Sequence, residues 1–265
     1  MSDPTLSGGA VKTEELFPDR DDSGAARSYL EGRPAETLFL ADWKDALFLH
    51  FRVDPDRLQS EIPFRIDRFG GNAFVSLVAF TMKRFRLKWG GKLGQWLMRP
   101  LATQRFLNLR SYVLGDAGSG IFFIREWLDH PLAVRLGRAT FGLPYRRAKL
   151  SFDHEGLCPG GKASNENGFF EYGAYNDETP ALLNSGSRDE FLLERYIAYA
   201  GEGRVPTFFR IWHPPWEVSP LRRIDIDDDS LLDSEMESWW PGAELVGGHL
   251  TRGVEAVWMG RPHHA

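Results

Sequence analysis

The stretch from Asn72 to Phe85, NAFVSLVAFTMKRF, restricts the possible folds more than any other part of the chain. A strand with one face in water alternates apolar and polar residues. This stretch is apolar at almost every position, so both of its faces should be covered. The segments RFLNLRSYVLG and GIFFIREWLD are predicted to be two further strands, joined by the turn-forming GDAGSG. The sequence therefore predicts a sheet with packed residues on both sides.

Only a few helices accompany these strands. DPDRLQSEIP is predicted to be a short helix with Asp54 as its N-cap, and HPLAVRLGRATFG a second that ends before Gly142. SRDEFLLERYIAYAG is predicted to be a third and longer helix, opened by a capping box of Ser187 and Glu190. Many strands with isolated helices, and no regular βαβ alternation, favour a mainly β (α+β) fold. We expect a closed or strongly curved antiparallel sheet with peripheral helices.

Composition and charge restrict the domain organisation, the possible partners and the cellular location of the protein. Residues 1–36 are rich in small and acidic residues without periodicity and are expected to be a flexible arm, followed by a single domain over residues 37–262. The net charge of −5 predicts no nucleic-acid partner and no membrane partner, although local basic patches remain compatible with it. The chain has no apolar run of membrane-spanning length and no secretory signal, and its one cysteine, Cys158, fits a cytoplasmic location. The oligomeric state stays open.

Five segments, taken in order, resemble those of the bacterial YqjF-like proteins, a family of unknown function. They are FLNLRSYV, GIFFIREWLD, FGLPYRRAKL, FLLERYIAYA and IWHPPWEV, and the opening FLHFRVDPDRLQSEIP extends the resemblance to roughly residues 38–260. That family is grouped with the acetoacetate decarboxylase-like superfamily. The resemblance implies a cone-like, double-layered β-barrel with a cavity for a small molecule.

The same resemblance also implies that the decarboxylase reaction is absent. The decarboxylases carry an aromatic-Pro-Lys-Lys motif whose first lysine forms a Schiff base, which requires an amine with a lowered pKa. When that motif is matched to this chain, Leu143 and Pro144 take its first two positions. Tyr145 takes the position of the nucleophilic lysine, and Arg146 that of the second lysine. A phenol cannot form an imine, and arginine stays protonated. We therefore expect no acetoacetate decarboxylase activity.

The direction of the side chains after this turn is ambiguous. Strand alternation puts Tyr145, Arg147 and Lys149 on one face, and Arg146 on the opposite face with Ala148. That second face looks buried, which conflicts with an inward Tyr145 unless the turn shifts the phase. Both Tyr145 and Arg146 therefore stay candidates for catalysis and for ligand binding, while Lys149 is interpreted as a surface residue.

Other polar residues have two interpretations each. Arg110, Arg125 and Glu126 lie in apolar strands, so they either form a structural ion-pair network or line a polar cavity that binds a carboxylate. His213, in WHPPW, is a candidate general acid or base, or a structural histidine at a rigid corner. The neighbouring Trp216 is a candidate for ligand stacking or for packing.

No known metal or cofactor motif is present. The acidic run DIDDDS lacks the glycine and the glutamate of an EF-hand loop, and no P-loop, Gly-x-Gly-x-x-Gly or His-Glu-x-x-His occurs. We expect neither a metal site nor a cofactor. Three functions remain: binding of a carboxylate or other anionic small molecule, an enzyme (lyase, isomerase or hydrolase) that uses Tyr145 and Arg146, or an interaction scaffold. Whether any reaction is catalysed, and on what ligand, stays open.

Overall fold

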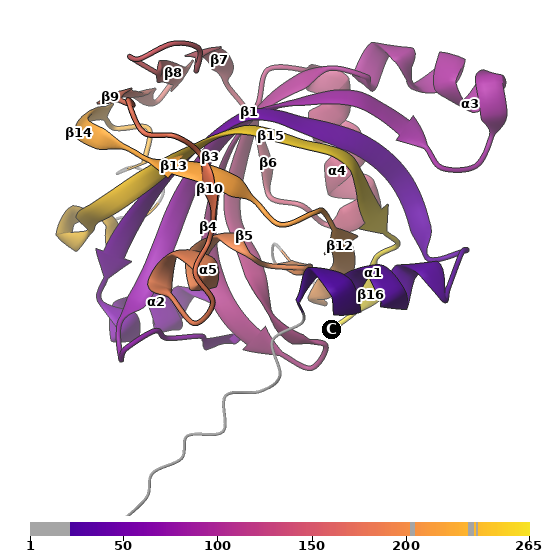
Figure 1. The fold of residues 1–265 in the computed structure, drawn as a ribbon, viewed down its shortest axis with the longest axis horizontal. Helices are drawn as coiled ribbons and strands as arrows, with labels where there is room; N and C mark the ends of the chain where they lie inside the picture. The colour runs from indigo at the N-terminus through magenta and orange to yellow at the C-terminus, as the bar shows by residue number, and fades with distance from the viewer. Residues whose placement is uncertain (1–21, 202–204, 233–235, 237) are drawn as a thin grey trace, which may run out of the picture.

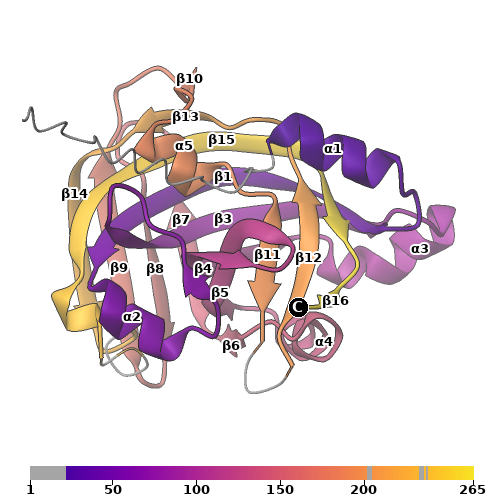
Figure 2. The same cartoon turned by 90° about the horizontal axis from the view of Figure 1, so that it is seen from below.

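The computed structural model describes residues 22–201, 205–232, 236 and 238–265. Its main sheet has twelve strands, seven of which form a closed ring (Figures 1 and 2). The ring closes where β12 pairs with β15 through Ile211↔Met259 and Trp212↔Trp258. In ring order the strands are β15 (Glu244–Gly260), β1 (Thr37–Val53), β3 (Ala73–Leu87), β4 (Gln104–Gly115), β5 (Gly118–Leu128), β11 (Ile197–Ala200) and β12 (Thr207–Trp212).

The remaining strands extend this sheet or form a second one. The extensions are β2 (Arg65–Ile66), β6 (Tyr145–Arg147), β10 (Ala181–Leu182), β13 (Glu217–Pro220) and β16 (His263–His264). The second sheet has the order β14-β9-β8-β7, with β14 (Arg222–Asp229), β9 (Gly168–Tyr175), β8 (Gly160–Asn165) and β7 (Lys149–Asp153). The ring pairs are antiparallel except for the β5–β11 pair.

Strand β3 is buried on both faces, as its composition predicted. Phe74, Val78 and Phe80 belong to the apolar cluster inside the ring. Val75 and Leu77, in the alternate positions, belong to a second cluster that includes Phe170 and Tyr172 of the second sheet. The fold therefore has two layers, and the expectation of a mainly β, double-layered architecture is confirmed.

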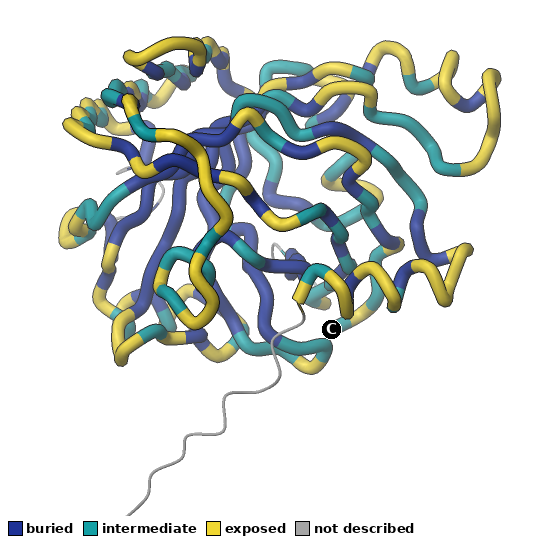
Figure 3. Tube along the Cα trace, viewed as in Figure 1, coloured by how far each residue is buried: buried dark blue, intermediate teal, exposed yellow. Residues whose placement is uncertain are grey.

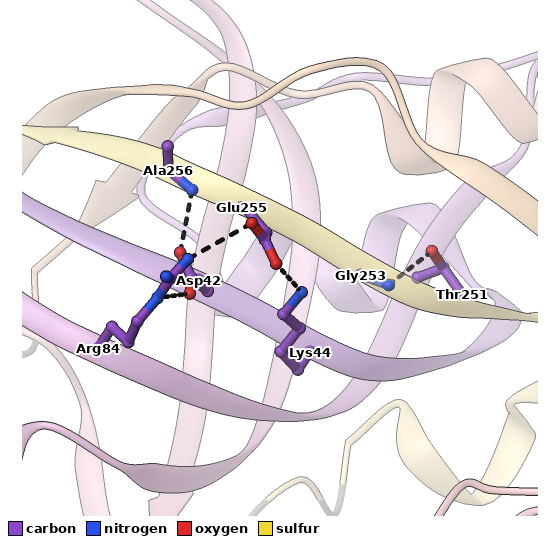
Figure 4. Close-up of polar contacts among 7 residues, drawn as sticks. All are labelled: Asp42, Lys44, Arg84, Thr251, Gly253, Glu255 and Ala256. Carbon is purple, nitrogen blue, oxygen red and sulfur yellow. Dashed lines mark hydrogen bonds and ion pairs between the residues drawn. The ribbon is translucent and has the colours of Figure 1, made fainter.

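A buried carboxylate links three long strands (Figure 4). Asp42 is 2% exposed and lies where the β1–β15 and β1–β3 registers both shift. It accepts a hydrogen bond from the Arg84 guanidinium and another, of 3.0 Å, from the Ala256 backbone N–H. Arg84 and Ala256 both have positive φ, as residues in β-bulges often do. The pKa of Asp42 is lowered by these hydrogen bonds and the nearby arginines, although burial opposes the shift.

The helices lie around the ring. They are α1 (Ser23–Glu31), α2 (Pro55–Glu61), α3 (Gly91–Met98), α4 (Pro131–Phe141) and α5 (Arg188–Leu193), with 3-10 turns at Arg99–Leu101 and Trp240–Gly242. The predicted N-cap is confirmed, because the Asp54 side chain accepts hydrogen bonds from the N–H groups of Asp56 and Arg57. Gly142 ends α4 with a φ of 65°, as predicted.

Two expectations about these segments are wrong. Residues 23–31 of the expected flexible arm form α1, because Ala26 and Leu30 bury their side chains against the domain; the rest of the arm up to residue 21 lies outside the described residues. The predicted long helix after Ser187 ends at Leu193. Residues 197–200 instead form β11, because all four are buried between β5 and β12.

Burial is concentrated in the ring strands (Figure 3). Within the described residues, no helix combines the length and apolar character needed to cross a membrane. Nor do those residues contain a cluster of three or more His, Cys, Asp or Glu side chains arranged to hold a metal ion.

Candidate functional site

A cavity of about 330 Å³ lies inside the ring. Most of its wall is aromatic or aliphatic. The apolar lining includes Phe39, Trp43, Phe48, Val78, Phe80, Phe106, Phe123, Phe141, Phe209, Ile211 and Trp216. Such a wall follows from the alternation of the ring strands, because every second side chain points inward.

Polar groups occupy one part of this wall. Gln104, Asn108 and Arg110 are alternate residues of β4 and therefore share its inward face. The strand register then places Glu126 of β5 beside Asn108, and Tyr145 of β6 beside Glu126. A polar row thus crosses three adjacent strands inside an apolar cavity.

Glu126 is the central group of this row. It is 3% exposed, and burial raises its pKa well above the usual range, while a hydrogen bond from Asn108 opposes the rise only partly. No ion pair joins it to Arg110, so the structural ion-pair interpretation does not hold for these two residues among the described contacts. The raised pKa favours the protonated form of Glu126, in which the carboxyl group can donate a hydrogen bond.

Four buried polar atoms of this row have no hydrogen-bond partner. They are Gln104 Oε1, Asn108 Oδ1, Arg110 Nε and Glu126 Oε2. Leaving such a group unsatisfied costs about 1–3 kcal/mol, so native proteins rarely collect several in one place. The four residues line the same cavity and bring to it two amide acceptors, one cationic donor and one carboxyl oxygen.

The turn after α4 sends Tyr145 into the cavity and Arg146 away from it. The ring of Tyr145 packs edge-on against Phe106, with centroids 6.0 Å apart, and burial and the proximity of Glu126 raise its pKa. Arg146 lines a shallow polar depression on the outside, together with Lys149. The alternation of side chains between the two strand faces is interrupted at Ala148, because the chain there leaves the ring and enters the second sheet.

Arg110 is anchored from behind the wall. Its Nη2 donates to the Leu192 carbonyl at 3.0 Å, and its guanidinium lies over the Phe48 ring at 5.4 Å. Tyr112 donates to the same carbonyl at 2.9 Å and also hydrogen bonds Ser76. These contacts hold the guanidinium at the cavity wall, and its Nε has no hydrogen-bond partner.

A chain of polar side chains continues from Ser76 to the surface. Ser76 contacts His50 Nδ1 at 2.7 Å, His50 Nε2 lies 3.1 Å from His249, and His249 lies 3.5 Å from the partly exposed Asp189. The pKa of His50 is lowered well below normal, chiefly by burial and also by its neighbours His249 and Arg110. The pKa of Asp189 is lowered to about 2, chiefly by its hydrogen bond with His249.

The two other predicted residues lie near the site. Trp216 lines the cavity. His213 does not; its ring packs between Tyr196 and Trp216, at centroid distances of 4.8 and 4.9 Å, and its Nδ1 bonds the Pro214 carbonyl at 2.8 Å. Burial lowers the pKa of His213 to about 4, which suits a structural histidine.

Sequence reasoning missed Gln104 and Asn108. Asn108 lies two residues before Arg110 in the predicted strand, and Gln104 lies six residues before Arg110, just outside that strand; this even spacing was the available signal. An amide residue carries little weight by itself, and the register that brings Asn108 beside Glu126 depends on the bulge between Leu109 and Arg110.

Two solved structures share this architecture. An acetoacetate decarboxylase-like enzyme from Sphingomonas wittichii RW1 superposes with a TM-score of 0.61, covering 87% of this chain and 94% of that one at 15% identity. The enduracididine biosynthesis enzyme MppR, complexed with the condensation product of pyruvate and imidazole 4-carboxaldehyde, gives a TM-score of 0.58. That match covers 86% of this chain and 88% of MppR at 12% identity. The protein therefore has the acetoacetate decarboxylase-like fold.

Sequence relatives define the family more narrowly. Residues 40–255 match DUF2071, described as an uncharacterized conserved protein (COG2071). Uncharacterized protein YqjF of Bacillus subtilis (strain 168) is 30% identical over 181 residues, which cover 66% of this chain and 72% of that protein. The chain belongs to the DUF2071 family, and its resemblance to the YqjF-like proteins is confirmed.

Proposed function

We propose that this protein binds a small carboxylic acid with an apolar body in the ring cavity, without forming a Schiff base. The main support is the set of four unpartnered polar atoms on Gln104, Asn108, Arg110 and Glu126, residues that all line one largely apolar cavity. A cavity of about 330 Å³ falls at the lower end of the roughly 300–1,000 Å³ typical of ligand pockets.

The polar row favours a carboxylate as the head group of the ligand. Arg110 Nε and, in its protonated form, Glu126 both suit the oxygens of a carboxylate, which accepts charge-assisted hydrogen bonds. The free oxygens of Asn108 and Gln104 suit a donor such as a hydroxyl group near that carboxylate. Aromatic residues, among them Trp43 and Trp216, would enclose an aryl or short alkyl body.

The lining of the cavity supports a function without imine chemistry. None of the described residues that line the cavity is a lysine, and Tyr145 occupies the place that the motif comparison gives to the nucleophile. MppR, which shares the fold, was captured with a product formed from pyruvate. An oxo acid or hydroxy acid is therefore a natural starting point for ligands of this cavity.

A thermal-shift panel of aromatic, hydroxy and oxo acids tests the proposal. Acids that bind only the folded state raise its stability in proportion to the logarithm of their concentration above Kd. We expect at least one acid to raise the Tm, and Arg110→Met to weaken its binding by tenfold or more, because the carboxylate loses its cation.

Arg105→Met is the matched control, because Arg105 lies exposed on the same strand. Because Arg110→Met also removes the bond to Leu192, affinity measured by quenching of cavity tryptophans accompanies the Tm. Equal binding by both variants, or stabilisation by no acid of the panel, contradicts the proposal.

A second candidate function is proton transfer on the bound acid. It is favoured by the buried Glu126, whose raised pKa suits a general acid, with Tyr145 beside it. Arg146 lies outside the cavity lining and has no part in this version. Turnover in the panel samples, followed by NMR and abolished by Glu126→Gln but not by Arg146→Met, would favour the enzyme over simple binding.

A further inference from the structure

The connection between β3 and β4 carries an apolar stripe that faces solvent. Trp89, Leu93, Trp96 and Leu97 are spaced as on a helix face that normally packs against a core. Here they are 60%, 69%, 66% and 58% exposed. Helix α3, which bears three of them, projects from the body of the protein, as Figures 1 and 2 show from two directions.

The same connection is basic. Residues 88–103 contain three Lys and Arg residues and no Asp or Glu, although the whole chain has a net charge of −5. Lys92 and Arg99 are exposed, and the described residues provide neither with an ion-pair partner. Lys88 lies over the rings of Trp89 and Trp258, at 5.3 and 5.0 Å.

The cavity reaches the surface next to this stripe. Its lining includes Met98 at the end of α3, and Leu136 and Thr140 on the exposed face of α4. Leu132 and Leu136 of α4 add two further exposed apolar side chains, 45% and 44% exposed. The end of α3 and the exposed face of α4 therefore both border the cavity.

We propose that the segment 87–102 docks this protein on the surface of a bilayer that contains anionic lipids. Exposed Trp and Leu side chains flanked by Lys and Arg are the pattern of an interfacial helix, which lies in the headgroup region without crossing the membrane. Docking in this way would place the cavity entrance against the lipid. The inference does not depend on which molecule the cavity binds.

Charge distinguishes the bilayer from a second copy of this chain. A two-fold interface built on α3 would bring each Lys92 and Arg99 toward the same residues of the other copy, and like charges at an interface oppose association. Anionic headgroups satisfy the cations, while the acyl boundary takes up Trp96 and Leu97.

Vesicle flotation tests the proposal with the full chain. We expect binding to vesicles of phosphatidylcholine mixed with phosphatidylglycerol, much weaker binding to phosphatidylcholine alone, and loss of binding in about 1 M salt, where screening is strong. Lys92→Glu/Arg99→Glu should lower the partition coefficient more than tenfold, since each cation contributes about fivefold. Trp89→Ser/Trp96→Ser should lower it comparably.

Matched controls separate docking from general surface effects. Leu182→Ser/Val205→Ser removes two equally exposed apolar side chains elsewhere, both 63% exposed, and should leave binding unchanged. Arg65→Glu/Arg252→Glu alters the net charge of the chain equally on other strands. If these controls lose binding as the α3 variants do, or if the α3 substitutions abolish a dimer seen by light scattering rather than vesicle binding, the proposal is wrong.

Discussion

Glu126 and His213 show how one environment gives two titratable side chains different roles. Both are almost fully buried, and burial opposes the charged form of each. Glu126 keeps an oxygen without a partner and faces the cavity, whereas His213 bonds the Pro214 carbonyl and stacks on aromatic rings. The unsatisfied group is thus the better candidate for ligand recognition, and the satisfied one stabilises the corner at residues 213–216.

His213 should make stability depend on pH. Its folded pKa of about 4 lies below the ordinary value of 6.5, so the unfolded chain takes up a proton first as the pH falls. Stability is therefore lost between pH 6.5 and pH 4, by about 3 kcal/mol for a shift of this size. His213→Asn, which retains a donor for Pro214, should flatten the decline in the free energy of unfolding measured in urea.

Burial lowers the pKa of His50 as well. The free energy of unfolding of the His213→Asn variant should therefore still decrease in part as the pH falls. Parallel curves for the variant and the parent protein would show that His213 does not titrate as described. Urea titrations near pH 7 and near pH 5 are sufficient to distinguish the two outcomes.

At the scale of elements, helix α4 and strand β6 are fitted together by one glycine. A Cβ added at Gly137 would lie 2.2 Å from Cε2 and 2.5 Å from Cδ2 of Tyr145. The absence of a side chain at Gly137 therefore allows the Tyr145 ring to lie between α4 and the cavity. Gly94, in α3, has no such neighbour, because its added Cβ would come no closer than 3.5 Å to another atom.

Gly137→Ala should therefore destabilise the protein by about 1–3 kcal/mol, the usual cost of overpacking. Gly94→Ala, the control, should be neutral or stabilising by up to ~1 kcal/mol, because alanine favours helix. In a Tyr145→Ala background, Gly137→Ala should cost much less stability in chemical denaturation than it does in the parent protein. Additive effects of the two changes would contradict the contact.

The sequence predicted elements whose signals are local. Asp54 caps α2, Gly142 ends α4, and the apolar run of β3 is covered on both faces. The prediction was wrong where the tertiary environment determines the structure. Residues 197–200 have a helical sequence pattern but form a strand between β5 and β12. The direction of Tyr145 could not be predicted, because it depends on the chain passing from one sheet to the other at Ala148.

For the whole molecule, α1 shows that the domain begins earlier than composition suggests. Leu30 is fully buried, the Ser23 hydroxyl donates to the His213 carbonyl at 2.7 Å, and Arg27 lies over the Trp212 ring. The helix thus covers β12, one of the two strands that close the ring. A polar, glycine-containing sequence concealed this packing, because only two of its nine residues are buried.

Leu30→Ala should lower the free energy of unfolding by about 2–4 kcal/mol, as expected for a buried leucine. Leu93→Ala, at a side chain that is 69% exposed, should change it by less than about 0.5 kcal/mol. Equilibrium unfolding in urea compares the two. Equal, small effects would mean that α1 contributes little to the folded domain.

The closure of the ring has a consequence for how the wall can move. Strands β11 and β12 join their neighbours through two registered pairs on each side, Ala198↔Ile121 and Tyr199↔Phe122 at one border and Ile211↔Met259 and Trp212↔Trp258 at the other. By contrast, β1 forms thirteen registered residue pairs with β15. The hairpin of β11 and β12 is therefore a seam, and its residues Phe209 and Ile211 set the width of the space behind it. Separating β11 and β12 from their neighbours breaks fewer strand pairs than deforming the long strands, so this is the expected way for the cavity to widen around a larger molecule.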